Sequence, residues 1–229
     1  MTTLVQQNNN HNSTATVTTA SLAIVLPGVA TVGNAICVGF AYGSSAGTPS
    51  LTSVTDNLGN NYTINQNNAR SGFSDNCGCA TFFPLTNAPQ TITVTCASTV
   101  SGTIAIFANA YEISPATAVD ASTTNTTGSV TAFNATFTTT AINEFAFASV
   151  TGSGGPTWTQ NNGWTQDFAS PGDGVWFFHN ILSSSGANSL NMTSSTANFY
   201  LWSLVSLTPA APPPSNTAGP VPRVKFILP

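Results

Sequence analysis

Charged side chains are almost absent from this sequence. Its 229 residues include three Lys or Arg and seven Asp or Glu, or 4% of the chain, where ordinary domains carry about 25%. Phosphate neutralisation needs clustered cations, so this composition excludes binding of nucleic acid. Enzymes that use paired acids and bases need ionisable groups, so we expect no catalytic residues and no enzyme activity.

Long hydrophobic runs are also missing. The N-terminal stretch MTTLVQQNNNHNST has neither the basic region nor the apolar core of a signal peptide. The most apolar stretch, residues 20–42, is interrupted by Pro27, Gly28, Gly33 and Asn34, so it is too broken to span a membrane. We expect no membrane span, in a chain that either works without a signal or is a mature secreted chain behind a new Met1.

Cysteine is scarce too. Cys37 and Cys96 lie in strand-like apolar patterns, which favours buried free thiols. Cys77 and Cys79 form a C-G-C pair, but zinc normally takes four ligands at wider spacing, so we expect no metal and no cofactor. A disulfide between one of this pair and Cys37 or Cys96 stays open, because spacing alone does not define connectivity.

Uncharged polar residues take the place of charge: Thr, Ser and Asn together supply 85 residues. They alternate with apolar residues, as in Gln90–Cys96, where Ile92, Val94 and Cys96 share one face and threonines share the other. Similar patterns predict further strands at residues 16–26, 34–42, 51–56, 61–65, 79–84, 103–113, 130–138, 144–151, 174–182, 189–193 and 197–207.

About twelve short strands separated by turns predict an all-β fold, an antiparallel β-sandwich of jelly-roll type. We expect an N-terminal arm at 1–15 and a single sandwich domain at 16–208. Two strands, Val175–Phe178 and Phe199–Trp202, carry apolar residues on both faces. One face suits the core, and the other could contact a loop, the N-terminal arm or a neighbouring subunit.

The C-terminus changes in character, since seven of the fourteen prolines lie in the last 21 residues. Residues 209–222 indicate a semi-rigid Pro-rich spacer. Residues 223–229 indicate an apolar arm that docks on its own domain or on another chain. The residues of this predicted interaction arm are Arg223, Val224, Lys225, Phe226, Ile227 and Leu228.

A predicted structural turn contains Asp56, Asn57, Gly59 and Asn60. Asn and Gly accept positive φ, and Asp56 can hydrogen-bond the loop backbone. The same oxygens could hold calcium, but the spacing does not match a calcium-binding loop.

Two lone ionisable residues, Glu112 and His179, lie within strand patterns and are interpreted as structural. Aromatic and amide side chains gather around W-T-Q-N-N-G-W. Flat rings beside amides suit a neutral sugar, so Trp158, Trp164, Gln160 and Asn161 form a possible glycan contact. The alternative is packing of these aromatic rings in the core or between loops.

The stretch from Thr16 to Pro209 resembles a family of mostly uncharacterised β-sandwich domains of bacterial surface proteins and phage virion proteins. The matching pieces include S-V-T-D-N-L-G-N-N-Y-T (53–63), A-N-A-Y-E-I-S (108–114) and N-E-F-A-F-A (143–148). The family pattern E-x-S-G is broken here by Pro115. The resemblance implies a fold and a virion or extracellular setting, and it brings no catalytic residues.

We therefore expect a structural virion protein, a capsid decoration (cement) protein or appendage subunit of a tailed phage. Its expected partners are copies of itself, with a trimer favoured, and a capsid or other assembly protein. The alternative is a secreted cell-surface module, either a pilus-like filament subunit whose C-terminal arm is a donor strand or a carbohydrate-binding adhesin.

Overall fold

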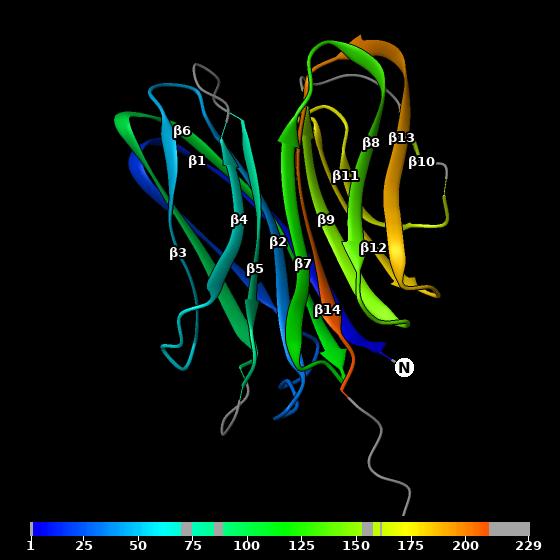
Figure 1. The fold of residues 1–229 in the computed structure, drawn as a ribbon. Helices are drawn as coiled ribbons and strands as arrows, with labels where there is room; N and C mark the ends of the chain where they lie inside the picture. Colours follow the sequence, from blue (N-terminus) through cyan, green and yellow to red (C-terminus); the bar gives the residue numbers. More distant parts are fainter. Residues whose placement is uncertain (1, 70–74, 85–88, 153–157, 161, 211–229) are drawn as a thin grey trace, which may run out of the picture.

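A computed structural model of the chain describes residues 2–69, 75–84, 89–152, 158–160 and 162–210 (Figure 1). These residues form antiparallel sheets and no helix, so the predicted all-β class is confirmed. The fourteen strands in the described ranges are β1 (Thr3–Val25), β2 (Ala35–Ser44), β3 (Pro49–Asp56), β4 (Thr63–Ala69), β5 (Asn76–Phe82), β6 (Thr91–Ser114), β7 (Ala118–Thr126), β8 (Val130–Thr139), β9 (Glu144–Gly152), β10 (Trp158–Gln160), β11 (Thr165–Ser170), β12 (Val175–Leu182), β13 (Gly186–Asn198) and β14 (Tyr200–Thr208).

The strands build two units with the same order of pairing, which we call unit one (β1–β6) and unit two (β7–β14). Unit two has an inner sheet, β7-β14-β9-β12-β11, and an outer sheet, β8-β13-β10. In unit one the long strand β1 corresponds to β7 and β8 joined, and β6 corresponds to β13 and β14 joined. The inner sheet of unit one is thus β1-β6-β2-β5-β4, and its outer sheet is β1-β6-β3.

Left-handed residues recur at equivalent turns of the two units. Gly59 (φ 81°) and Gly163 (φ 79°) each follow the last residue of their strand, β3 or β10, by three positions. Gly33 (φ 91°) and Asn143 (φ 60°) lie at corresponding places before β2 and β9. Gly tolerates positive φ, and Asn sometimes does. The two units therefore share the same backbone conformation at these turns.

The two inner sheets pack face to face, and Figure 1 shows the units side by side with β2 and β5 next to β7, β9 and β14. One buried cluster spans the two units: Cys37, Cys79 and Tyr111 of unit one share it with Phe147 and Val205 of unit two. The inner strands are therefore covered on both faces, by their own outer sheet and by the other unit.

This arrangement explains the two strands with apolar residues on both faces. Trp176 and Phe178 point into the core of unit two, whereas Val175 and Phe177 point into the contact between units. Of the covers that the sequence left open, the N-terminal segment contributes as part of β1, since the His11 ring stacks on Phe107, which packs in one cluster with Val175 and Phe177. The cover is the first half of the same chain.

The contact between the inner sheets is self-complementary. Gly39 in β2 and Ser149 in β9 are equivalent, because each lies opposite the same pair of strand partners in its unit. A Cβ on Gly39 would lie 2.8 Å from Ser149 Oγ and 3.2 Å from Phe177. Cys79, the equivalent of Phe177, lies 3.9 Å from Ser149 Oγ. Reciprocal contacts of this kind characterise a two-fold dimer interface, here within one chain.

The segment expected as an N-terminal arm, 1–15, lies almost wholly in β1 and pairs with β6. Asn8 and Asn10 hold it against the second part of the same strand. Their amide nitrogens donate to the carbonyl oxygens of Val25 and Ala23 at 2.7 and 2.8 Å. The polar run that looked like a loose arm is thus a strand edge closed by side-chain amides.

Other strand boundaries differ from the prediction for local reasons. The predicted strands Gln90–Cys96 and 103–113 belong, apart from Gln90, to the continuous strand β6. The strands β7, β10 and β11 were missed because their many polar residues give little apolar alternation. At the other end, β14 ends at Thr208. Apart from residues 209 and 210, the predicted spacer 209–222 and the arm 223–229 lie outside the described residues.

Candidate functional site

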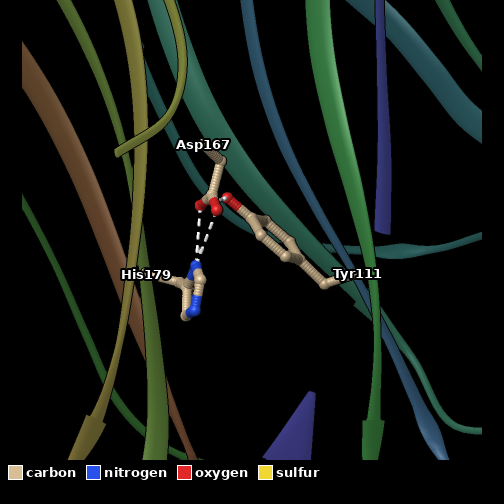
Figure 2. A network of polar contacts seen from close by, with 3 residues as sticks. All are labelled: Tyr111, Asp167 and His179. Atoms are coloured by element: carbon tan, nitrogen blue, oxygen red, sulfur yellow. Dashed lines mark hydrogen bonds and ion pairs between the residues drawn. The ribbon is translucent and has the colours of Figure 1, made fainter. Parts of the chain in front are cut away.

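Three polar side chains meet between the inner sheets: Tyr111 from β6 of unit one, and Asp167 and His179 from β11 and β12 of unit two (Figure 2). The Tyr111 hydroxyl donates to Asp167 Oδ2 at 2.7 Å. His179 Nδ1 lies 2.8 Å from each carboxylate oxygen of Asp167. The network therefore joins the two units through polar contacts inside an apolar layer.

Strand periodicity positions two members of this network. Tyr111 shares a face of β6 with Phe107, and His179 shares a face of β12 with Phe177, because side chains alternate along a strand. Asp167 is positioned by an irregularity of its strand. The register of β11 shifts between Gln166 and Phe168, so a β-bulge lies at Asp167. Bulges re-aim side chains, and this one accompanies the carboxylate that reaches the contact between units.

The surroundings of the network are buried and aromatic. The Asp167 and His179 side chains are 1% and 13% exposed. The Phe145 ring stacks on His179 at 5.5 Å and meets Tyr111 edge-on at 5.5 Å. Burial, and then the charge of Asp167, raise the pKa of Tyr111 well above its ordinary value. Tyr111 therefore stays protonated over the physiological range and acts as a donor to Asp167.

The chemistry open to this network is limited by its neighbours. An Asp–His pair is the orienting part of a nucleophilic triad, in which the imidazole also contacts a Ser, Thr or Cys. Among the described residues, none of those side chains hydrogen-bonds to His179. The partner that completes the network is Tyr111 of the other unit. The arrangement fits a polar link that fixes how the two units are packed.

His179 is thus a strand histidine with a satisfied ring nitrogen, as interpreted from the sequence. Glu112 is 1% exposed and accepts hydrogen bonds from the backbone nitrogen of Thr31 and the side chains of Asn34 and Gln6. Tyr111 and Asp167 were missed. An available signal was Asp167 itself, one of seven acids in the chain, inside a strand-like run beside the aromatic strand β12.

The turn residues lie where the sequence places them. Asp56 Oδ1 accepts hydrogen bonds from the backbone nitrogens of Leu58 and Asn60 at 2.9 and 3.1 Å, and the Asn60 side chain also reaches this carboxylate. Asn57 Oδ1 accepts from the backbone nitrogens of Gln90 and Thr91. The side-chain oxygens of Asp56 and Asn57 that were considered for calcium accept these loop contacts instead. In the part of the chain that the structure describes, no group of three or more His, Cys, Asp or Glu is placed to hold a metal.

The possible glycan residues belong to the equivalent turn of unit two. When its amide is oriented to satisfy both ends, Gln160 accepts from the backbone nitrogens of Asn162 and Trp164 at 2.7 and 2.8 Å, as Asp56 does in unit one. Trp164 is 5% exposed, packs edge-on against Phe137 and donates to the Ser189 carbonyl oxygen. Its ring is therefore core, with no face open to a sugar.

Two of the four glycan candidates cannot be placed in this way. Asn161 and the side chain of Trp158 lie outside the described residues. The backbone of Trp158 pairs with Ser194 at the start of β10. The interaction arm, Arg223 to Leu228, also lies outside the described residues.

All four cysteines are free and buried. Burial raises the pKa of Cys77 and of Cys96 to about 12 and moves the pKa of Cys37 and Cys79 in the same direction. At pH 8 the thiolate fraction at a pKa of 12 is roughly one in ten thousand. We expect the native chain to take up no iodoacetamide at pH 8, and the urea-unfolded chain to take up four equivalents, measured by mass spectrometry. A Ser101→Cys variant, with its thiol at an exposed position, should react in the native state; rapid labelling of the parent chain would contradict the burial of its thiols.

Comparison of the chain with protein-family models, curated proteins and solved structures found no match in any of the three. Across the described ranges, no helix has the length and hydropathy needed to cross a membrane.

Proposed function

We propose that this chain is a structural subunit of a virion, a capsid decoration protein or an appendage subunit of a tailed phage. The observation that carries the proposal is the neutral character of its outward strand positions. Ser21 and Thr95 hydrogen-bond across the outer sheet of unit one at 2.9 Å, and no Lys or Arg is among the described residues. Surfaces of this kind bind neighbours through hydrogen bonds and apolar burial, without long-range electrostatic attraction.

We also propose that each unit is of jelly-roll type. Numbering β7 to β14 from one to eight, the inner sheet of unit two runs 1-8-3-6-5 and the outer sheet runs 2-7-4. A jelly roll has eight strands in two such interleaved sheets, and viral capsid and lectin domains use it. This analogy, together with the resemblance to phage and surface domains, supports the proposed setting without identifying a partner.

The C-terminal segment is the proposed attachment to neighbouring molecules. It follows β14 directly, and its Pro-rich spacer leads to the arm Arg223–Leu228. We expect the full chain to form an oligomer, with a trimer as the favoured form, and a variant ending at Ala210 to be a monomer. The truncated chain should still unfold in one cooperative transition, because all fourteen described strands remain, but its melting temperature should no longer rise with protein concentration, because the subunit contacts are lost. Sedimentation equilibrium and thermal unfolding measure both quantities.

A matched variant replaces Phe226, Ile227 and Leu228 by Ser in the full-length chain, which removes the apolar side chains and keeps the length. It should behave as the truncated chain does. A truncated chain that assembles like the parent would overturn the role of the segment. For the virion setting, antibody detection across a density gradient of particles from the producing culture is decisive: the chain should band with particles, and a location in the cell envelope would favour the surface-module alternative.

A further inference from the structure

Two carboxyl groups meet beside the turn that joins β8 to β9 in unit two. Glu144, the first residue of β9, is 0% exposed, and its carboxyl group hydrogen-bonds to that of Asp120 in β7. Within the described ranges, Oε2 of Glu144 accepts no hydrogen bond. Two ionised carboxylates are both acceptors, so a hydrogen bond between them requires a proton on one of them. The contact therefore requires the pair to hold one proton.

The same two side chains hold the turn. The backbone nitrogen and the hydroxyl of Thr140 donate to the oxygens of Asp120 at 2.7 and 2.5 Å. The backbone nitrogen of Ala141 donates to Oε1 of Glu144 at 2.8 Å, and the Ser206 hydroxyl also reaches this carboxyl group. The position of the turn between the outer and inner sheets thus depends on both carboxyl groups.

Unit one lacks such a pair at the equivalent place. Asn34 is the equivalent of Glu144, since each follows the left-handed residue of its turn. The Asn34 amide donates to the Glu112 carboxylate at 2.5 Å, and this contact needs no added proton. The β-bulge of β7 that presents Asp120 corresponds to the β-bulge of β1 at Val5, an exposed apolar residue. Unit two has therefore replaced an amide–carboxylate contact by a contact between two carboxyl groups.

The strands around Glu144 bring one titratable partner, Asp120. Side chains alternate along β9, so Glu144 points to the same side as Ala146, into the core of unit two. The strands β8 and β13 carry no titratable side chain, and Tyr200 of β14 lies at the opposite end of the neighbouring strand. His179 of β12 points to the other face, between the units. The proton is thus shared within the pair alone, among the described residues.

The surroundings place this proton on Glu144. Burial raises the pKa of Glu144, and the charge of Asp120 acts in the same direction. Burial acts likewise on Asp120, but its hydrogen bonds from Thr140 outweigh burial and lower its pKa. Between the ordinary glutamate pKa, about 4.3, and the raised value in the folded chain, folding takes up a proton, so stability falls as the pH rises through this range. The contribution of Asp120 has the opposite sign and is lost only in acid, as the pH falls through its lowered pKa.

We propose that the Asp120–Glu144 pair is a pH-dependent switch that holds the β8–β9 turn closed while it shares one proton. Loss of that proton leaves two negative charges at hydrogen-bond distance, and their repulsion opens the turn. The turn also receives the start of unit one, since the Thr2 backbone nitrogen donates to the Asn143 carbonyl oxygen. Opening therefore loosens the first residues of the chain, which makes one contact between the two units dependent on pH.

Hydrogen exchange of the Thr140 and Ala141 amides in the full chain tests the switch, measured by NMR from pH 5 to pH 9 and corrected for the intrinsic exchange rate. We expect the protection of both amides to fall about tenfold over this range. The ¹³C shift of the Glu144 carboxyl group should titrate with a midpoint above the ordinary glutamate value. EDTA in every sample excludes a metal ion that takes the place of the proton.

Glu144→Gln supplies a permanent donor to Asp120, so the protection of both amides should stay the same from pH 5 to pH 9. Asp120→Asn is a second variant with the same expectation, because its amide donates to Glu144 and its oxygen still accepts from Thr140. Asp173→Asn is the matched control: it removes one carboxylate at an exposed position of another turn and should keep the pH dependence of the parent chain.

Two results would overturn the proposal. One is constant protection of the Thr140 and Ala141 amides in the parent chain, with Glu144 titrating at the ordinary glutamate value. The other is a Glu144→Gln or Asp120→Asn chain whose amides lose protection between pH 5 and pH 9 as those of the parent do.

Discussion

Replacing Asp167 by Ala is expected to lower the free energy of unfolding by about 3 kcal/mol, because two buried hydrogen bonds are lost and their donors remain buried. The Tyr111 hydroxyl and His179 Nδ1 would both lose their acceptor between the inner sheets. Water cannot readily replace it where the carboxylate is 1% exposed. Urea unfolding at pH 7, followed by tryptophan fluorescence, measures the change.

Two variants make this result interpretable. Tyr111→Phe removes one donor and leaves the Asp167–His179 contact, so its cost should be about half as large. Asp173→Ala removes a carboxylate at an exposed position that bonds the Ser170 hydroxyl, and its cost should stay below about 1 kcal/mol. An Asp167→Ala chain as stable as the Asp173→Ala chain would show that the network contributes nothing to holding the units together.

The second large effect concerns separation of the two units. Chains 1–116 and 117–229 expressed apart should each be insoluble or unfolded, whereas co-expression should yield a soluble one-to-one complex. Each unit alone exposes the apolar face of its inner sheet, which includes Cys37 and Cys79 in one and Phe147 and Val205 in the other. Exposed apolar faces of this extent drive association or aggregation. Co-purification through a tag on one fragment measures the complex.

A substitution at the contact provides the matched comparison. Gly39→Phe places a ring where a Cβ alone would already press on Ser149 and Phe177, so the complex of fragments should not form. Gly128→Phe points into open space and should leave it intact. Folded monomeric fragments that ignore each other would mean that the units are independent domains merely joined in sequence.

Alternation of threonine with apolar residues was enough to predict the all-β class and most of the strands. It could not predict what covers the second face of a strand, because a two-sided apolar pattern is the same for a loop, a partner or a second unit. The duplication of the two units is not visible in the sequence, because the units share the spacing of their strands and the backbone conformation of their turns more than they share amino-acid identity. Asp56 and Gln160 perform the same turn-closing role with different chemistry.

The site was predictable only in part, for a similar reason. His179 could be recognised as a strand histidine, since its own strand shows the alternation. Its partner Asp167 lies at a bulge, where a period of two no longer indicates direction. Tyr111 comes from a strand more than fifty residues away, and which strands face each other is a property of the whole fold.

The amides of Asn8 and Asn10 have a consequence for growth of larger assemblies. Their nitrogens occupy the carbonyls of Val25 and Ala23, and their oxygens accept from the backbone nitrogens of Asn9 and His11. An uncovered strand border is a template on which foreign chains can polymerise. At these positions the chain's own side chains take up backbone groups that a foreign strand would need, so strand addition is disfavoured here and we expect an ordered lattice to grow from other sides of the molecule.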